Sequence, residues 1–426
     1  MPSLVASTDR RASGGTVYLS HLKLTNFRSF QHLELALPEG PSIFVGTNAQ
    51  GKTTLLEAVY LLAIARAFRA ENEREVVNWR AATAGHQAAV DGLLIGDNGR
   101  LRVIVGYQPT RATPAPQPSP SDGVGMLVRK EIRVGGVRRS AADLVGVLNA
   151  VLFSADDIQL VTGAPSQRRR FLDILISQAD SSYLRSLQRY QKVLQQRNQL
   201  LKALREGRAK EPELDFWNVE LTKEGAFITT KRVDAVRLLS VKAKSLLKEL
   251  TQGREALEID YRPSVEAEKN GTLETRMAQA LTTSLRRDLS TGSTSVGPHR
   301  DDFKLLINGV DMSSYSSRGQ ARTLALALRL AEASYLSSVK GEPIMLLDDV
   351  LSELDVQRRR QVLERVQGFR QTLITTTDLA PFESGFLAMA TIYGVNKASV
   401  QVVKGAGQVL SSEIEARLGL LGAPES

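Results

Sequence analysis

The chain has 426 residues, with 55 Lys or Arg against 46 Asp or Glu, so its formal net charge is +9. The length predicts two or three domains, and a hydrophobic fraction of 42% is typical of a globular protein. The absence of cysteine excludes disulfides, thiolate metal sites, iron–sulfur clusters and a cysteine nucleophile, while the modest positive charge favours an acidic partner such as nucleic acid.

Residues 1–15 lack the apolar segment of a secretory signal, and we predict a flexible leader there. The most apolar helical stretch, Leu55 to Phe68, carries Glu57 and Arg66 and is too short to cross a bilayer. We therefore expect a cytoplasmic protein with no membrane partner.

Short β-like runs begin at Val17 and lead to an apolar strand over 42–45, and a helix with apolar spacings of three and four starts near Thr53. A hairpin is expected over 87–107. Residues 108–123 hold five of the 15 prolines and predict an inserted surface loop. We assign residues 16–165 to the first part of an α/β domain.

The composition changes near Ser166, where a polar helical stretch rich in Gln and Arg begins. A heptad seam runs from Leu187 to Leu204, and a second helix then extends to about Leu250. This pattern suits an antiparallel hairpin arm and a compact helical subdomain equally well, because two or three heptads rarely sustain a free coiled coil. We place this helical lobe at 166–290.

Alternating strand and helix patterns return after the lobe. They predict strands at 296–307, 344–347 and 372–376 and helices at 319–337 and 355–366. We assign 291–405 to the second part of the α/β domain and 406–426 to a tail.

The strongest motif lies between the 42–45 strand and the following helix and fits G-x-x-x-x-G-K-[ST]. It consists of Gly46, Thr47, Asn48, Ala49, Gln50, Gly51, Lys52, Thr53 and Thr54. Inward-pointing N–H groups and the positive helix end can hold phosphates, Lys52 adds a point charge, and the Thr53 hydroxyl can ligate a metal. We predict ATP and Mg²⁺ as cofactors.

A phosphate loop of this kind needs a carboxylate at the end of an apolar strand, and the strand over 344–347 runs into Asp348 and Asp349. We expect Asp348 on the metal side and Asp349 beside the attacking water, which it positions or deprotonates.

The order of the remaining motifs resembles that of ABC-type ATPases. Ser317, Gly319 and Gln320 open a helix before the Asp348 strand, and Ser352–Asp355 follows that strand. In that family the signature Ser and Gly bind the γ-phosphate of ATP held by the other subunit. The resemblance therefore adds Ser317 to the catalytic candidates Lys52, Asp348 and Asp349.

Four further segments narrow the resemblance to the RecF family, the SMC-related branch of ABC-type ATPases, over about residues 17–404. They are Leu24–Phe30, Gln167–Asp173, Gly297–Asp302 and Arg318–Thr323. The resemblance implies an α/β ABC-type P-loop ATPase head of mixed sheets with an inserted helical or short coiled-coil lobe. It also implies an ATP-dependent homodimer that binds duplex DNA near single-stranded gaps and, with RecR and RecO, helps to load the RecA recombinase.

Two residues depart from fast ABC-type ATPases. Asp349 stands where those enzymes carry Glu, and Thr377 stands where many relatives carry His. The shorter carboxylate positions water poorly, so we predict a weak ATPase in which hydrolysis acts as a switch. We also expect DNA to stimulate this hydrolysis.

Positive charge gathers on the helical lobe, and few aromatic residues accompany it, which favours contacts to the backbone of duplex DNA over base stacking. The candidate DNA contacts are Arg168, Arg169, Arg170, Arg185 and Arg189. A solvated helix face is the plainer explanation of any one of these arginines.

Two residue pairs allow more than one interpretation. We expect His299 and Arg300 either to structure the junction between lobes or to sense the nucleotide, and Arg66 and Arg69 to approach the adenine or the phosphates. The alternative functions are a transporter ATPase subunit and an SMC-like structural DNA clamp without useful turnover.

Overall fold

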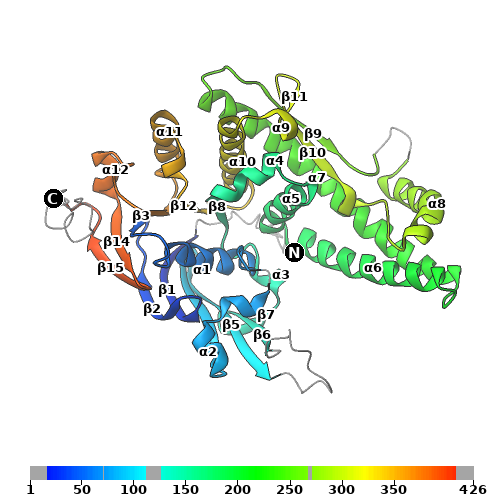
Figure 1. Cartoon of the computed structure of the whole chain (residues 1–426), viewed down its shortest axis with the longest axis horizontal. Coiled ribbons are helices and arrows are strands. Elements are labelled where there is room, and N and C mark those ends of the chain that lie inside the picture. The colour runs from blue at the N-terminus through cyan, green and yellow to red at the C-terminus, as the bar shows by residue number, and fades with distance from the viewer. Residues whose placement is uncertain (1–16, 71, 112–125, 267–270, 409–426) are drawn as a thin grey trace, which may run out of the picture.

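The computed structural model describes residues 17–70, 72–111, 126–266 and 271–408. The leader at 1–15, most of the proline-rich segment and the end of the tail lie outside this range. Two six-stranded sheets form the head, and the helical lobe lies beside them (Figure 1).

The first sheet is antiparallel, in the order β2-β1-β4-β5-β6-β7. Its strands are β1 (Val17–Phe27), β2 (Phe30–Ala36), β4 (Ala88–Gly96), β5 (Gly99–Arg111), β6 (Met126–Val134) and β7 (Val137–Arg139). Because β5 continues to Arg111, our prediction of a loop from residue 108 is wrong for its first four residues. Pro109 is tolerated because the last β4–β5 pair is Ala88 with Tyr107, so Pro109 lies at a sheet edge.

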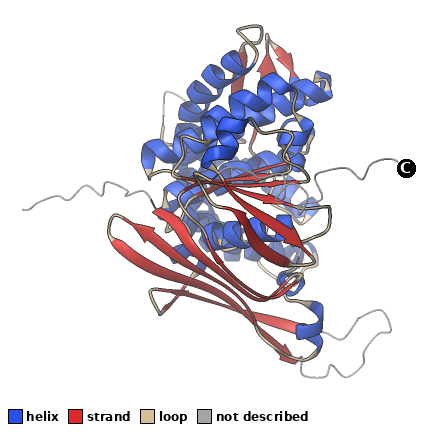
Figure 2. Cartoon of the chain, turned by 90° about the vertical axis from the view of Figure 1, so that its left-hand side faces the viewer, coloured by secondary structure: helices blue, strands red, loops and turns tan. Residues whose placement is uncertain are grey.

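The second sheet is mixed, in the order β15-β14-β3-β13-β12-β8, with four parallel pairs from β14 to β8. Its strands are β3 (Gly40–Val45), β8 (Ala150–Ser154), β12 (Ile344–Asp348), β13 (Gln371–Thr376), β14 (Thr391–Asn396) and β15 (Ser399–Lys404). Helix α1 (Lys52–Ile64) contacts strands of both sheets, which explains why ten of its residues are buried (Figure 2).

Short helices connect these strands. They are η1 (Glu73–Val76), α2 (Trp79–Thr83), α3 (Ala141–Leu144), η2 (Ala155–Ile158), α4 (Gln159–Thr162), η5 (Leu351–Glu353), α11 (Val356–Val366) and α12 (Ser384–Met389). Strand β12 is apolar on both faces because each face packs in a different core. Met345 and Leu347 belong to the core shared with the helical lobe, whereas Ile344 and Leu346 belong to the core around α1.

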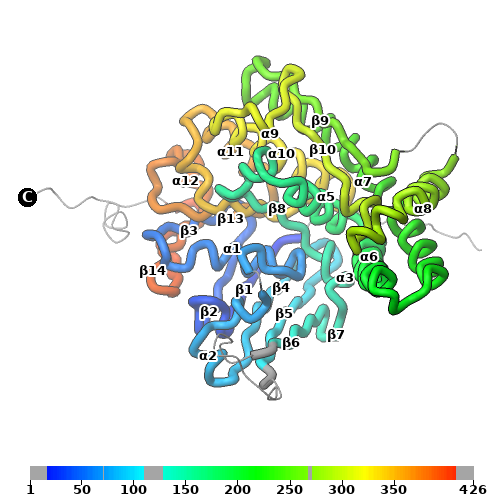
Figure 3. The backbone as a smooth tube through the Cα atoms, turned by 45° about the vertical axis from the view of Figure 1, so that its right-hand side comes forward, coloured from blue at the N-terminus to red at the C-terminus, as the bar shows by residue number. Residues whose placement is uncertain are grey.

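The helical lobe is built on two antiparallel helices (Figure 3). Its elements are α5 (Pro165–Ala179), α6 (Ser181–Arg205), η3 (Glu211–Glu213), α7 (Leu214–Leu250), β9 (Leu257–Arg262) and α8 (Leu273–Thr291). The hydrogen bonds from Ser186 to Glu224 and from Arg197 to Asn218 fix the antiparallel register of α6 and α7.

The pair is not a free arm, because α8 packs on both helices and α7 continues onto the head. Lys242 near the end of α7 donates a hydrogen bond to Ser334 of α10 (Arg318–Val339) at 3.2 Å.

A small sheet, β11-β10-β9, joins the lobe to the second half of the head. The elements in this part of the chain are η4 (Pro298–Arg300), β10 (Asp302–Ile307), β11 (Val310–Asp311) and α9 (Met312–Tyr315). Two predictions are corrected here. Strand β9 interrupts the stretch that we expected to be helical, and the strand that we expected from residue 296 begins at Asp302, after the turn η4.

None of the helices in the described ranges is both long enough and apolar enough to span a membrane.

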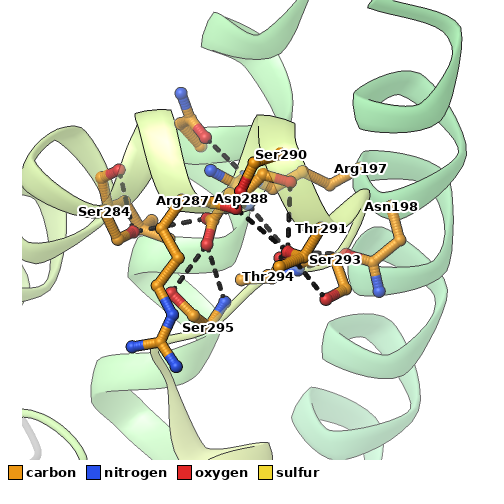
Figure 4. Close-up of polar contacts among 12 residues, drawn as sticks. Arg197, Asn198, Ser284, Arg287, Asp288, Ser290, Thr291, Ser293, Thr294 and Ser295 are labelled. Carbon is orange, nitrogen blue, oxygen red and sulfur yellow. Dashed lines mark hydrogen bonds and ion pairs between the residues drawn. The ribbon is translucent and has the colours of Figure 1, made fainter. Parts of the chain in front are cut away.

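A buried ion pair holds the lobe to the segment that leads into β10 (Figure 4). Arg197 of α6 and Asp288 of α8 are both fully buried and lie 2.9 Å apart. Arg197 also donates to the Thr294 hydroxyl at 2.7 Å, and Asp288 accepts from the Ser295 N–H at 2.9 Å. The pair thus ties α6, α8 and residues 294–295 together.

Replacing Arg197 by Ala is expected to lower the free energy of unfolding by about 3–5 kcal/mol, because the Asp288 charge is left buried without a partner. Urea denaturation measures the loss. The double variant Arg197→Met with Asp288→Asn keeps an acceptor for Ser295 and removes the charge, so it should recover part of that stability. A double variant less stable than Arg197→Ala would contradict this interpretation.

Candidate nucleotide site

The loop between β3 and α1 is held tightly against its neighbours. A Cβ atom placed on Gly46 would lie 2.2 Å from the Val395 carbonyl oxygen, so only glycine fits beside β14. Gly51 caps α1 with a φ of 105°, in the left-handed region that favours glycine. The backbone N–H groups at the start of α1 have no carbonyl partner within the helix, which makes this end an anion-binding position.

Lys52 is 7% exposed and turns back onto the loop. Its ammonium donates hydrogen bonds to the carbonyl oxygens of Thr47, at 2.9 Å, and Gly46. Burial lowers the pKa of Lys52, whereas the carboxylates of Asp349 and Asp348 act in the opposite direction. A phosphate at the loop would add further negative charge beside the ammonium and stabilise its charged form.

Thr53 and Asp348 come together although 295 residues separate them. The Thr53 hydroxyl donates to Asp348 Oδ1 at 2.8 Å, and the Thr375 hydroxyl of β13 donates to the same oxygen at 2.9 Å. A hydroxyl and a carboxylate oxygen are hard donors of the kind that Mg²⁺ prefers, so these residues fit that ion. No cluster of three or more His, Cys, Asp or Glu able to hold a metal occurs among the described residues.

Asp349 adopts a left-handed backbone conformation, with a φ of 54°. Asp tolerates this region better than most residues, and the Thr375 hydroxyl accepts a hydrogen bond from the Asp349 N–H at 3.1 Å. Burial raises the pKa of Asp349, the Lys52 charge opposes that shift, and the Asp348 charge adds to it. A carboxyl with a raised pKa at a strained position fits the role of a base.

These residues line a cleft of about 570 Å³. Its lining consists of Ser29, Asn48, Ala49, Gly51, Lys52, Thr53, Thr54, Phe68, Arg69, Ser154, Ala155, Asp156, Asp348 and Asp349. Arg69 therefore lies beside the loop, as the sequence suggested, whereas Arg66 lines a separate cleft between the head and the lobe. Residues 316–320 do not contribute to the 570 Å³ cleft in the part of the chain that the structure describes.

The signature segment forms the beginning of α10 and faces solvent. The Ser317 hydroxyl accepts from the Gln320 N–H at 3.2 Å, and Gln320 Oε1 accepts from the Ser317 N–H at 3.1 Å, which is a capping box. Ser317 and Gly319 are exposed, and no atom lies within 4 Å of a Cβ built on Gly319. This helix end is thus open to a ligand or to another molecule.

The segment after β12 connects the two halves of the site. The Ser352 hydroxyl donates to the Asp349 carbonyl oxygen at 2.8 Å, and Glu353 pairs with Arg322 of α10 at 2.8 Å. Two large apolar side chains next to these motifs face solvent. Tyr315 is 74% exposed and Val356 is 78% exposed.

Several residues of the site escaped the sequence interpretation because their partners are distant in the chain. Glu57, inside α1, forms a bidentate ion pair with Arg28 at 2.8 and 2.9 Å and accepts from the Arg69 N–H at 3.3 Å. Thr375 likewise lies in a strand that carries no motif, whereas Ser29 lies in the Leu24–Phe30 segment of the family resemblance, which gave it no role in the site. A strand ending in Thr-Thr-Thr was the only available signal for Thr375.

The arginines proposed for DNA differ in their surroundings, and Arg168 is a correction. It is 6% exposed and pairs bidentately with Asp302 at 2.7 and 2.9 Å, so we withdraw it from the DNA contacts. Arg169 is half-buried and donates to the Asp301 carbonyl oxygen. Arg170 and Arg185 are exposed, with no ion pair among the described residues.

Arg189 and the junction residues are also engaged. Arg189 is exposed but pairs with Glu220 and Glu224. His299 Nε2 bonds to the Thr294 carbonyl at 3.0 Å, so this nitrogen carries the proton, and Nδ1 accepts from the Tyr190 hydroxyl at 2.6 Å. Burial lowers the pKa of His299 to about 4, so neutral His299 and Arg300, which also donates to Thr294, structure the junction between lobe and head.

Comparison with known proteins identifies similar chains over most of the length. Residues 18–403 match the family described as the RecF/RecN/SMC N terminal domain. The DNA replication and repair protein RecF of Chloroflexus aurantiacus is 40% identical over 396 residues, covering 90% of this chain and 99% of that one. The RecF of Halalkalibacterium halodurans is 35% identical over 390 residues, covering 90% of this chain and 99% of that one.

Solved structures give the same result. The recombination mediator protein RecF with ATP, in the RecFOR pathway, superposes with a TM-score of 0.79 at 34% identity, covering 92% of this chain and 99% of that one. An Smc head domain from Pyrococcus yayanosii gives a TM-score of 0.51 at 13% identity, covering 95% of this chain and 99% of that one. This similarity shows a shared fold alone.

Proposed function

Because this chain belongs to the RecF family of DNA replication and repair proteins, we propose that it is an ATP-gated dimer that binds DNA. The solved RecF with ATP supports ATP binding at the loop of residues 46–54. Family membership also argues against the alternative function of a transporter ATPase subunit, since the similar proteins are DNA replication and repair proteins.

The residues around the loop supply the chemistry of phosphate binding. The N–H groups of the loop and the charge of Lys52 hold the phosphates. Thr53 and Asp348 are the residues that would hold Mg²⁺, which when bound neutralises charge on the β- and γ-phosphates. Asp349 orients or deprotonates the attacking water. Its short side chain makes slow hydrolysis the expected outcome, and Thr377, whose hydroxyl donates to Asp378 at 3.2 Å, offers no imidazole to assist.

The single observation that carries the dimer is the separation of the two half-sites. Ser317 and Gly319 are exposed and uncrowded, yet they do not line the cleft that holds Lys52. An anion-binding helix end without a ligand in its own chain suits the γ-phosphate of ATP bound to a second copy. The exposed Tyr315 and Val356 would then be covered in the same contact.

DNA binding draws on the exposed charge of the helical lobe. Arg170, Arg185 and Arg189 face solvent, and Arg169 is partly accessible. We further propose duplex DNA near single-stranded gaps as the preferred form, stimulation of hydrolysis by that DNA, a cytoplasmic location, and RecR- and RecO-like mediators as partners in loading a RecA recombinase.

The triple variant Arg170→Ala, Arg185→Ala, Arg189→Ala tests the DNA surface. Each lost phosphate contact should reduce the slope of log K against log salt by about 0.9, with weaker binding at every sequence. Fluorescence anisotropy of labelled duplex DNA at several salt concentrations measures this change. The control is Arg358→Ala with Arg360→Ala on α11, which removes the charges of a half-buried and an exposed arginine elsewhere on the surface. Equal slopes for the triple variant and the native chain would contradict the assignment.

A further inference from the structure

A second cleft of about 780 Å³ lies on the head next to the nucleotide site. Its lining consists of Arg28, Ser29, Gln31, His32, Glu75, Val77, Asn78, Trp79, Arg80, Lys397 and Ala398. Ser29 also lines the nucleotide cleft, so the two clefts adjoin. None of the functions assigned above uses Trp79, Arg80 or Lys397.

Trp79 is the aromatic group of this cleft, and 69% of it is exposed. The Arg80 guanidinium lies 5.3 Å from the centroid of its ring. The other tryptophan, Trp217, is partly buried and packs edge-on against Phe216. An indole left in solvent beside a cation offers a flat apolar surface for a ligand, because water solvates that surface poorly.

The charge around Trp79 is mostly positive. Among the described residues neither Arg80 nor Lys397 has an ion pair with a carboxylate, and both are exposed. Arg28 is engaged by Glu57, and the Glu75 carboxylate accepts from the Asn72 N–H at 3.1 Å. Two cations without a carboxylate partner, in one cleft with an exposed aromatic ring, suit a planar group that is linked to phosphates.

The same cleft is connected to the phosphate loop. Lys397 and Ala398 form the tight turn between β14 and β15, with φ values of 45° and 57°. The Lys397 N–H donates to Gln50 Oε1 at 2.6 Å, and the Ala398 N–H donates to the Gln50 carbonyl oxygen at 3.1 Å. A ligand that contacts Lys397 therefore acts on the turn that supports Gln50, two residues before Lys52.

We propose that this cleft binds single-stranded DNA, with a base stacked on Trp79 and the neighbouring phosphates on Arg80 and Lys397. The inference rests on the proposed DNA-binding function and assigns the single-stranded part of a gapped substrate to a site apart from the helical lobe. Contact with Lys397 gives that strand a direct connection to the phosphate loop, through which DNA stimulates hydrolysis.

Intrinsic fluorescence tests the stacking directly, because the chain contains two tryptophans. In the Trp217→Phe background, Trp79 is the only indole, and oligothymidylate is expected to quench it whereas a blunt duplex is not. Trp79→Ala should weaken the binding of oligothymidylate by roughly 5- to 150-fold, the value of one base–aromatic stack, and leave the affinity for blunt duplex unchanged. Trp217→Phe alone is the matched control and should bind both as the native chain does.

The outcomes separate this site from the general function. Trp79 is exposed, so an unchanged melting temperature of Trp79→Ala establishes that its fold is intact. The inference is wrong, and the proposed function stands, if duplex DNA binds normally but oligothymidylate does not quench the Trp79 fluorescence and binds Trp79→Ala as tightly as the native chain. If the native chain binds no form of DNA, the proposed function itself fails.

Discussion

Lys52→Met is expected to abolish the pairing of chains by ATP and to weaken ATP binding roughly 30- to 150-fold, or about 2–3 kcal/mol. Lys52 is the only cation of the loop, and this residue, which is 7% exposed, lines the cleft. Met has a similar length and preserves the packing of the stem, so the variant removes the charge and little else. Without that charge the γ-phosphate is bound too weakly to recruit a second molecule.

Sedimentation velocity with ATP, with ADP and without nucleotide measures this effect. The control Lys244→Met removes an exposed lysine of α7 that takes no part in the site, and it should dimerise like the native chain. A Lys52→Met chain that dimerises with ATP as the native chain does would show that the loop does not hold the nucleotide that joins the dimer.

Asp349→Asn is expected to slow hydrolysis by about 10²- to 10⁴-fold while the ATP-bound dimer persists. The amide cannot accept a proton from water, but it can still occupy the left-handed position at a φ of 54°, which Asn tolerates well. Single-turnover phosphate release measures the rate. Asp215→Asn, an exposed position on α7, is the control, and a native rate in Asp349→Asn would remove Asp349 from the mechanism.

The pH dependence of the native rate follows from the same residue. Burial raises the pKa of Asp349 above its ordinary value of 3.8, and the base must be deprotonated to act. At low nucleotide concentration the rate should therefore fall as the pH drops through this raised pKa, and it should be flat above it. The Asn variant should lack this acidic limb.

The phosphate loop was predictable because its chemistry is local. Nine consecutive residues, from the end of β3 into the first turn of α1, contain the glycines, the lysine and the hydroxyl that phosphate binding requires. The expected RecF-family ATPase head with its inserted helical lobe is confirmed by the comparisons and by the two sheets that both contact α1.

The errors came from long-range contacts. Arg168 lies in a run of three arginines that suggested a basic surface, but the helical period turns it inward to Asp302, 134 residues away. Strand β9 has a strand signal of its own, since Leu257, Ile259 and Tyr261 alternate with polar residues, but this six-residue run was outweighed by the helical pattern around it, and only its pairing with β10 identifies it. The coupling of Gln50 to Lys397 spans 347 residues and could not be inferred from either segment alone.

Mixing two inactive variants tests the shared site most directly. Lys52→Met lacks a working loop and Ser317→Arg lacks a working signature, so each is expected to hydrolyse no ATP by itself. A mixed dimer contains one complete site, formed by the native loop of one chain and the native signature of the other. The mixture should therefore recover activity, up to about half of the native rate if every chain enters a mixed dimer. A mixture as inactive as its components, or a fully active Ser317→Arg chain, would contradict an ATP held between two molecules.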